Sequence, residues 1–302
     1  TRVGRGLCPP AAAAAAAACG HAAASRGGRE RQGALRCEAE AAFSKSEFRT
    51  FPILEVRQAT PDTKVLKCQL PSDGHRMGMT VSSMVMVQGA KAEDGTAPAK
   101  PYTPITTDDQ LGYFELLVKG YPTGLVSKYL CSLRPGDTVV VKGPFTKLAY
   151  TANMKKHIGM IAGGSGITPM VQVLKEILKN PSDTTSVTLV YGNQTPSNIP
   201  LRAELDAMAK SSKGRLKVVY VVDKNDTNDK HIFHEGYVTA EVCASVLPKP
   251  SEDVLVYVCG PPGMLKAVAG GKKIEKGKPP AQGEVEGVLK ELGYTSDMVY
   301  KF

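Results

Sequence analysis

Hydrophobic and polar positions divide the chain into two parts that have different periods. From about residue 48 to residue 150, apolar residues alternate with polar ones in short segments, as in half-buried β-strands. From residue 151 onward, short apolar runs alternate with segments in which apolar residues recur at helical spacing. The pattern predicts two domains, a β-domain over residues 48–150 and an α/β domain over residues 151–302.

The first part contains short predicted strands and one predicted helix. Turn sequences such as Pro71–Gly74 and Arg134–Asp137 separate the strands. Several short strands at this spacing indicate a closed antiparallel β-barrel. The predicted strands are Phe51–Arg57, Lys64–Leu70, Ser83–Gln88, Tyr113–Val118 and Thr138–Lys142, and the predicted helix is Leu125–Leu133.

The second part alternates strands with helices. Its strands are apolar throughout, which is typical of strands that are buried on both faces of a parallel sheet. We expect a doubly wound α/β fold, in which ligands bind at the carboxyl ends of the strands. The predicted strands are Ile158–Ala162, Val187–Tyr191, Leu216–Val222 and Val254–Cys259, and the predicted helices are Pro169–Lys179, Arg202–Ala209, Val238–Ser245, Gly263–Val268 and Gly283–Leu292.

Two glycine-containing turns, Gly163–Gly166 and Cys259–Gly263, fall at such strand ends. Glycines let the backbone approach a charged group closely, and a helix N-terminus supplies free N–H groups that favour an anion. The first turn lacks the three spaced glycines of a dinucleotide fingerprint and the Gly-Lys-Ser/Thr of a P-loop. An ordinary strand-to-helix turn is therefore the alternative, and the phosphate-binding interpretation depends on finding both turns at one edge.

Residues 1–47 differ from both domains and read as a leader. Residues 1–37 hold six Arg and one Glu in a chain of formal net charge +9, and alanines fill positions 11–18. An Arg-rich, acid-poor segment is typical of an organelle transit peptide, with disordered low complexity as the alternative. We expect a mitochondrial location, with the plastid as second choice, and ordered structure from about Phe48. The charge of the remainder is too small to indicate nucleic-acid binding, but it would suit an acidic protein partner.

The seven cysteines are scattered, with no Cys-x-x-Cys and no His/Cys pair at zinc spacing. This favours free thiols in a reducing compartment and no metal site. His231 and His234 stand three residues apart, but their Asn and Asp neighbours indicate a loop. No run of 18 apolar residues occurs, so no transmembrane helix is predicted. Membrane association stays open, and a monomer is the default expectation.

Five motifs in order resemble the ferredoxin–NADP reductase superfamily. They are Lys100–Pro104 (KPYTP), Gly120–Leu130 (GYPTGLVSKYL), Gly163–Met170 (GGSGITPM), Tyr191–Gln194 (YGNQ) and Cys259–Met264 (CGPPGM). The final segment, Gln282–Phe302, resembles the NADH–cytochrome b5 reductases, especially their mitochondrial branch. The resemblance covers about residues 48–302. It implies a β-barrel FAD domain followed by an NADH-binding domain, with hydride transfer from NADH to FAD and single-electron delivery to cytochrome b5 or a similar acidic haem protein.

The resemblance implies an FAD site in the first domain. Tyr102 would pack on the isoalloxazine and Thr103 would hydrogen-bond near its reactive nitrogen; a barrel-core aromatic and an ordinary strand residue are the alternatives. The helix start at Gly124–Ser127 would face the pyrophosphate. The family usually has Arg where this chain has Lys100, and a point charge in place of a planar fork should bind FAD less tightly. The implied FAD-binding residues are Lys100, Pro101, Tyr102, Thr103, Val118, Lys119, Tyr121, Gly124, Val126 and Ser127.

The resemblance also implies an NADH site at the two glycine turns. Thr168 would sit between flavin and nicotinamide, and Cys259 would lie beside the nicotinamide C4, where it sets geometry and need not be a nucleophile. A small buried hydrophobe is the alternative for Cys259. Asp223 would accept from the ribose 2′-hydroxyl and disfavour NADPH, unless it only caps a turn. The implied NADH-binding residues are Gly163, Gly164, Gly166, Thr168, Pro169, Asp223, Cys259, Gly260, Pro261 and Met264, and the implied catalytic residues are Thr103, Thr168 and Cys259.

Two other functions stay open at this stage. One is a reductase for another acceptor, such as ferredoxin or a quinone. The other is a catalytically silent flavoprotein subunit of a membrane complex, for which Lys100 is the one indication. Phe302 would lie either at the site or only in packing. The lysine-rich tract Gly270–Pro280 is either a solvated loop or a docking segment for an acidic haem protein.

Overall fold

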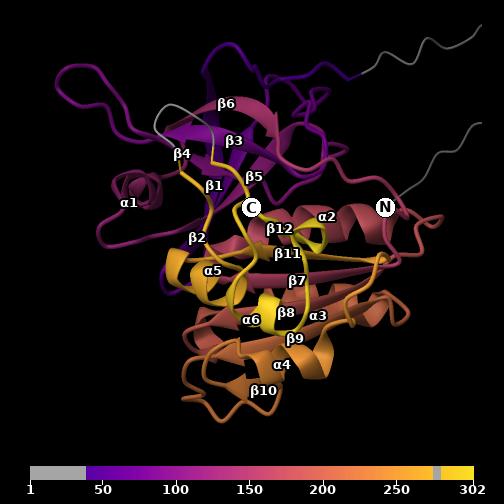
Figure 1. The fold of residues 1–302 in the computed structure, drawn as a ribbon. Helices are drawn as coiled ribbons and strands as arrows, with labels where there is room; N and C mark the ends of the chain where they lie inside the picture. The colour runs from indigo at the N-terminus through magenta and orange to yellow at the C-terminus, as the bar shows by residue number, and fades with distance from the viewer. Residues whose placement is uncertain (1–38, 275–279) are drawn as a thin grey trace, which may run out of the picture. The chain divides into compact units, whose positions relative to one another are not determined.

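Two six-stranded sheets organise the chain in the computed structural model, which describes residues 39–274 and 280–302 (Figure 1). One sheet is antiparallel and the other parallel, so the predicted fold class is confirmed. The first sheet contains β1 (Arg49–Thr60), β2 (Thr63–Gln69), β3 (Ser83–Gln88), β4 (Ala99–Tyr102), β5 (Tyr113–Lys119) and β6 (Thr138–Thr146). The second contains β7 (His157–Gly163), β8 (Ser186–Asn193), β9 (Leu216–Val222), β10 (Ile232–Glu235), β11 (Val254–Cys259) and β12 (Val299–Lys301). The helices are α1 (Leu125–Ser132), α2 (Ile167–Lys179), α3 (Arg202–Ser211), α4 (Ala240–Val246), α5 (Pro262–Ala269) and α6 (Gly287–Glu291).

The antiparallel sheet curls into a barrel. Its strand order is β4-β3-β6-β1-β2-β5, and the N–H of Ile105, just after β4, donates to the carbonyl of Glu115 in β5 at 2.9 Å. The two ends of the sheet therefore meet. Buried residues alternate along β3, and the rings of Phe43, Phe51 and Phe114 pack edge to face with centroids 5.0 to 5.4 Å apart. This aromatic cluster is the centre of the barrel core.

The barrel begins earlier than the sequence indicates. The N–H groups of Ala42 and Phe43 donate to the carbonyls of Arg76 and Met77 at 2.8 and 3.1 Å, and both side chains are buried. The expected start near Phe48 is therefore wrong, because one aromatic residue anchors a segment that has no strand pattern of its own. The rest of the predicted leader lies outside the described residues, as do residues 275–279 of the lysine-rich tract.

The parallel sheet is wound in both directions. Its strand order is β10-β9-β8-β7-β11-β12, so the chain reverses direction across the sheet between β7 and β11. Apolar residues of α2 and α3 pack on one face, and those of α4, α5 and α6 pack on the other. A ligand crevice is expected outside the carboxyl ends of the strands at such a reversal. Among the described residues, no helix has both the length and the apolar character needed to cross a bilayer.

The two sheets share a hydrophobic core through α2. Val65, Ile105 and Leu117 of the barrel domain belong to the same buried cluster as Ile167 and Met170 of α2. In Figure 1, α2 lies between the barrel and the parallel sheet. Burial of this joint apolar surface fixes one domain against the other.

Three short elements depart from the expected pattern. β4 and β12 were not predicted, and the segment around His231 and His234, predicted as a loop, forms the edge strand β10 that pairs with β9. The last helix starts at Gly287 and not at Gly283, and both glycines have positive φ (62° and 68°). Such backbone angles are incompatible with a helix interior.

The last strand ends in a buried lysine. Lys301 is 1% exposed, and its ammonium donates to the carbonyls of Ala269, Gly271, Gly283 and Glu284 at 2.8 to 3.3 Å. Burial lowers the pKa of Lys301, and nearby acidic groups oppose that shift. One side chain thus holds the segment after α5 beside the segment before α6.

Candidate functional site

A cavity of about 900 Å³ lies between the barrel and the parallel sheet. On the barrel side it is lined by the motif at β4 and by the start of α1, and on the sheet side by the two glycine turns. The motif and helix residues are Lys100, Pro101, Tyr102, Thr103, Gly124, Val126 and Ser127, and the sheet residues are Gly166, Thr168, Pro169, Cys259, Gly260 and Pro261. The structure therefore brings the three predicted catalytic residues to one cavity.

A second cavity of about 500 Å³ adjoins the first. It lies at the carboxyl ends of β7, β8 and β9, and its lining includes Gly163, Gly164, Asp223 and Met264. Lys119, Tyr121 and Pro261 line both cavities. The two groups of residues that the sequence assigned to two cofactors are therefore adjacent in space.

The two glycine turns pack directly on each other. Ala162 of β7 is the register partner of Cys259 in β11. A β-carbon on Gly166 would lie 2.2 Å from the carbonyl oxygen of Cys259, and one on Gly163 would lie 2.4 Å from the Met264 sulfur. Gly166 must be glycine because the opposing atoms are backbone, whereas at Gly163 the fixed obstacle is the Pro261 ring, 2.9 Å from the same β-carbon.

Gly164 differs from its two neighbours. Its φ is +51°, and the nearest atom to a β-carbon there, 3.8 Å away, belongs to the Lys119 side chain. Of the three glycines expected to approach a pyrophosphate, Gly164 lines the second cavity and is the one where a β-carbon would meet only ordinary van der Waals contacts. Gly163 and Gly166 serve first to bring the strand ends together.

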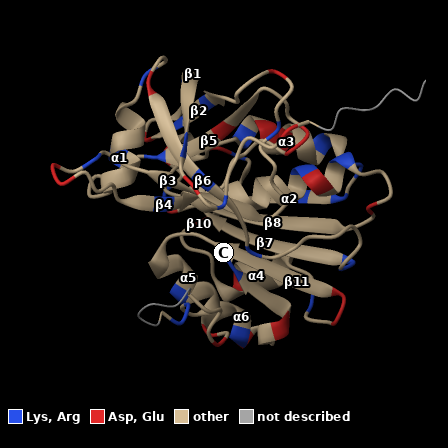
Figure 2. Cartoon of the chain, turned by 90° about the horizontal axis from the view of Figure 1, so that it is seen from above, with Lys and Arg blue, Asp and Glu red and all other residues tan. Residues whose placement is uncertain are grey.

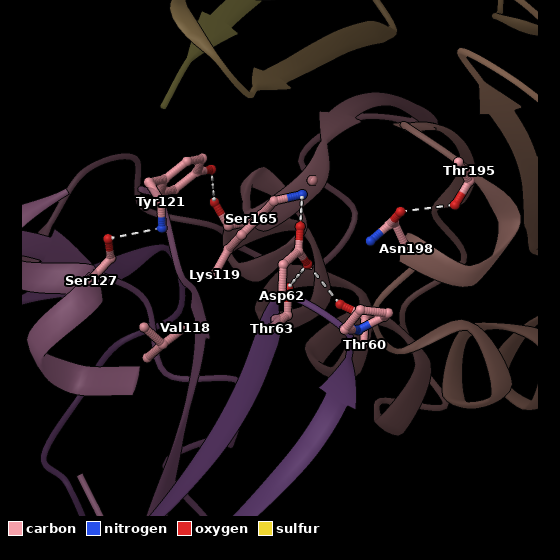
Figure 3. A network of polar contacts seen from close by, with 12 residues as sticks. Thr60, Asp62, Thr63, Val118, Lys119, Tyr121, Ser127, Ser165, Thr195 and Asn198 are labelled. Carbon is pink, nitrogen blue, oxygen red and sulfur yellow. Dashed lines mark hydrogen bonds and ion pairs between the residues drawn. The ribbon is translucent and has the colours of Figure 1, made fainter. Parts of the chain in front are cut away.

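Lys119 is held between the cavities by an acidic partner. Its ammonium lies 2.9 Å from Asp62 Oδ2, and the hydroxyls of Thr60 and Thr63 donate to Asp62 Oδ1 at 2.9 and 2.8 Å (Figure 3). Burial raises the pKa of Asp62, but these hydrogen bonds and the Lys119 charge outweigh burial and keep that pKa below its ordinary value. Only 12% of the Lys119 side chain is exposed, so it is not a solvated barrel lysine.

Tyr121 connects the barrel to the first glycine turn. Its hydroxyl lies 3.1 Å from Ser165 Oγ, and its N–H donates to Ser127 Oγ at 3.3 Å (Figure 3). Ser127 also donates to the carbonyl of Gly124 at 3.4 Å, at the start of α1. The start of the helix, Tyr121 and the glycine turn therefore form one hydrogen-bonded chain across the domain boundary.

Burial sets the protonation of the groups around the first cavity. It raises the pKa of Tyr102, so the phenol is neutral, and it raises the pKa of the Cys259 thiol to about 11, against the opposing charge of Lys272. Burial also lowers the pKa of Lys272. Thr168 is nearly buried and donates to the carbonyl of Ser165 at 3.3 Å. At neutral pH, Cys259 thus offers a thiol and not a nucleophilic thiolate.

Phe302 both packs and lines the first cavity, so the two alternatives left open for it are compatible. Its N–H donates to the carbonyl of Val258 at 2.9 Å, and its ring packs edge-on against Tyr257 at 5.5 Å.

Asp223 lies at the rim of the second cavity. Its N–H donates to the carbonyl of Asn193 at 3.0 Å, and partial burial raises the pKa of its carboxyl. Within residues 39–274 and 280–302, no hydrogen bond to the Asp223 carboxylate occurs, so the turn-cap alternative has no support there. The amide of Asn193 is buried in the same cavity wall, and neither its nitrogen nor its oxygen has a partner in the described chain.

Val118 is the predicted site residue that lines neither cavity. Its side chain is fully buried in the barrel core. The sequence assignment missed other lining residues, among them Ser82, Ser83, Met84, Lys147 and Lys272 in the first cavity and Asn193, Gln194, Tyr237 and Val238 in the second. Asn193 and Gln194 were within reach of prediction, because they end a parallel strand.

Among the described residues, no three His, Cys, Asp or Glu side chains are grouped so as to hold a metal ion.

Two family descriptions match the chain. Residues 50–150 match the oxidoreductase FAD-binding domain, and residues 160–270 match the oxidoreductase NAD-binding domain. Fold, cavities and matches together define a two-domain flavoprotein oxidoreductase.

Relatives narrow this class. The NADH-cytochrome b5 reductase-like protein of Arabidopsis thaliana is 42% identical over 265 residues, which cover 86% of this chain and 78% of the relative. NADH-cytochrome b5 reductase 2 of Mycosarcoma maydis is 42% identical over 267 residues, 86% and 74% of the two chains. The crystal structure of the cytochrome b5 reductase domain of Ulva prolifera nitrate reductase superposes with a TM-score of 0.75 at 29% identity, covering 87% of this chain and 100% of that one. The chain belongs to the NADH-cytochrome b5 reductase family, and the resemblance read from its motifs is confirmed.

Proposed function

We propose that this chain takes a hydride from NADH onto FAD and passes single electrons to cytochrome b5 or a similar acidic haem protein. The observation that carries the proposal is the junction of the two cavities. Thr103 of the barrel, Thr168 of α2 and Cys259 of β11 all line the first cavity, and Lys119, Tyr121 and Pro261 line both cavities. A ligand in the first cavity would therefore contact all three residues, and a ligand in the second cavity would meet it at the shared residues Lys119, Tyr121 and Pro261.

The first cavity fits a flavin dinucleotide. It offers an aromatic wall at Tyr102, the N-terminus of α1, where free N–H groups favour a phosphate, and a cation at Lys100. In the proposed role, Tyr102 packs on the ring system and Thr103 hydrogen-bonds to it. Ser127 holds the start of α1 in place through Tyr121. Pro101, Lys119, Gly124 and Val126 complete the FAD-binding set, and Val118 supports it only from the barrel core.

The second cavity fits the adenosine and pyrophosphate of NADH. Gly164 and Lys119 line this cavity side by side, so a phosphate could approach both the backbone and a cation. Asp223 stands at the far rim, where a carboxylate accepts from a ribose 2′-hydroxyl and repels a 2′-phosphate. The unpaired amide of Asn193 provides further polar contacts. Gly163, Gly166, Pro169, Gly260, Pro261 and Met264 shape the passage between the cavities.

The protein's own part in the reaction is geometric. Bound FAD would supply the two-electron to one-electron conversion that connects a hydride donor to a haem acceptor. Cys259 and Thr168 would contact the nicotinamide when NADH is bound, and the neutral thiol of Cys259 adds no charge there. Phe302 and Lys272 line the same cavity.

An anaerobic titration of the full chain with NADH tests the proposal. We expect a yellow protein whose visible absorbance bleaches with one equivalent of NADH and responds poorly to NADPH. Re-oxidation by cytochrome b5 then tests the acceptor against ferredoxin and a quinone. A colourless protein, or a yellow one that NADH does not bleach, would instead support the silent-subunit alternative.

We propose in addition that the protein is a mitochondrial monomer, and its association with membranes is tested alongside. The support for the mitochondrial location is the composition of the leader, which has six Arg and one Glu in residues 1–37. Fusion of residues 1–47 to a fluorescent protein should direct the fusion to mitochondria. Sedimentation of the full chain with and without mitochondrial membranes tests the other two points.

A further inference from the structure

Gln172 is a buried polar residue of α2 that lines neither cavity of the site. It is 2% exposed and lies one helical turn after Thr168. Its Oε1 accepts from the N–H of Ser83 at 3.1 Å, and its Nε2 donates to the carbonyl of Pro104 at 3.5 Å. Ser83 begins β3 and lines the first cavity, and Pro104 directly follows Thr103. One side chain therefore binds the barrel backbone at two points beside the cavity.

The contact continues along one face of α2. Residues 168, 172, 175 and 179 share this face, because they are spaced by three or four positions. The ammonium of Lys175 donates to the carbonyl of Ile105 at 2.8 Å, and that of Lys179 lies 3.2 Å from Asp109 Oδ1. The segment 103–109 of the barrel thus runs beside α2 in the same direction. Thr103 and Thr168 lie at the cavity end of this shared contact.

The three bridging side chains are not equivalent. Lys175 and Lys179 are partly exposed, and each also pairs with an acidic residue, Glu204 or Glu176, at 2.8 Å. Figure 2 shows the mixed charges on α2 and α3. Exposed ion pairs contribute little to fixing a geometry. Loss of Gln172 would instead leave a buried N–H without its acceptor, which a protein tolerates poorly.

We infer that Gln172 is a positioning residue that sets the separation of Thr103 and Thr168 across the first cavity. The inference rests on the proposed function, since this separation matters only when a hydride passes between groups held on the two sides. A misplacement of about 1 Å can cost about 10²-fold in rate. Because Gln172 lines neither cavity, its loss leaves the direct contacts to both cofactors in place. Its effect should fall on the transfer step and not on binding.

Stopped-flow reduction of the full, FAD-loaded chain tests the inference. Gln172→Met keeps the length of the side chain and removes both hydrogen bonds. We expect its flavin-reduction rate to fall about tenfold or more, while FAD content and the half-saturating NADH concentration change by less than about twofold. Lys179→Met, at the far end of the same helix face, is the matched control and should reduce at the wild-type rate.

Gln172→Glu separates positioning from bulk packing. It keeps the acceptor for Ser83, and its protonated form regains a donor for Pro104. Burial favours the protonated carboxyl. The reduction rate of Gln172→Glu should therefore rise toward wild type as the pH falls, whereas the wild-type rate should not. The inference would be overturned if Gln172→Met lost FAD to the same extent as it lost rate, and if the rate of Gln172→Glu did not rise as the pH falls.

Hydrogen exchange gives a readout that needs no activity. In the flavin-free chain, the Ser83 amide should exchange faster in Gln172→Met than in wild type or Lys179→Met, because its acceptor is gone. A wild-type flavin that NADH does not bleach would overturn the proposed function. A Gln172→Met protein that NADH reduces at the wild-type rate would overturn this inference alone.

Discussion

The α-carbon of Gly166 stands so close to the carbonyl oxygen of Cys259 that a β-carbon on Gly166 would lie 2.2 Å from that oxygen. The two residues belong to turns at the ends of neighbouring parallel strands, β7 and β11. The chain reverses direction across the sheet at this point. The contact therefore fixes the wall on which Cys259 and Thr168 face the first cavity.

Gly166→Ala should force these turns apart. Because the opposing atoms are backbone, no side-chain rotation can relieve the overlap, and we expect a loss of about 1–3 kcal/mol in the free energy of unfolding. Flavin reduction by NADH should slow as well, since the cavity wall moves. Urea unfolding checks the first effect. Gly263→Ala is the stability control, because a β-carbon there meets nothing within 4 Å; equal losses in both variants would contradict the steric explanation.

Cys259→Ala should slow flavin reduction about tenfold while leaving FAD binding unchanged. The thiol has a pKa of about 11, so it stays neutral below that pH and becomes a thiolate only above it. The wild-type rate should therefore show no step from this group between about pH 6 and 9. Stopped-flow rates across this range, with flavin content measured in parallel, check both statements. Equal loss of rate and of flavin would indicate a folding role for Cys259.

Asp223→Ala should raise the use of NADPH relative to NADH. The substitution removes the carboxylate that repels a 2′-phosphate and accepts from a 2′-hydroxyl, and we expect the kcat/KM ratio to shift about tenfold or more toward NADPH. Partial burial raises the pKa of Asp223, so selectivity for NADH should weaken in acid as the carboxyl protonates. Steady-state kinetics with both dinucleotides measure the ratio. An unchanged ratio would remove Asp223 from the specificity site.

Asp62→Asn should lower stability at neutral pH but not in acid. Hydrogen bonds and Lys119 hold the pKa of Asp62 below its ordinary value despite burial. The carboxylate therefore stabilises the fold above about pH 4, and this contribution is lost as the pH falls through the folded-state pKa. We expect a difference of about 1 kcal/mol at pH 7 that vanishes in acid. Denaturant unfolding at several pH values measures it. Asp253→Asn, at the exposed pair with Lys156, should show no such difference.

Lys100→Arg should tighten FAD binding. Lys100 lines the first cavity from β4, and a guanidinium fork can bind a phosphate through two hydrogen bonds where an ammonium acts as a point charge. We expect the dissociation constant for FAD to fall about threefold to tenfold. Fluorescence titration of the flavin-free protein measures it. If the arginine variant binds FAD no more tightly, Lys100 is not a weak point of the site.

The strongly patterned elements could be predicted from the sequence. β3, β9 and β11 match their predicted bounds, because each is an apolar or alternating run that ends at a turn residue. β4 could not be predicted from its pattern, since Lys100 and Pro101 are exposed and only four residues pair. β10 and β12 are edge strands of four and three residues, which is too short for a hydrophobic pattern to identify them. Their pairing depends on tertiary context and not on local preference.

The residues of the site likewise divide into those that a local sequence pattern indicates and those that depend on tertiary contacts. Glycines at parallel-strand ends carry a local signal, and Gly164, Gly166 and Cys259 line the cavities. Ser82 and Lys147 line the first cavity only because β3 pairs with β6, which no local pattern reveals. In the sequence, nothing distinguishes Gln172 from other residues of its helix, because its role depends on a contact with a barrel segment almost seventy positions earlier.

Lys301 places a tethered cation within a ring of four carbonyl oxygens. Rings of carbonyl oxygens are also the ligands that strip and hold monovalent ions in selective channels. In Lys301→Ala, the same oxygens would surround a vacant space close to the size of an ammonium group. A monovalent cation from solution would then take the place of the Lys301 ammonium in the last segment of the chain. The thermal stability of Lys301→Ala would therefore depend on the potassium or ammonium concentration of the solution, whereas that of the wild-type chain would not.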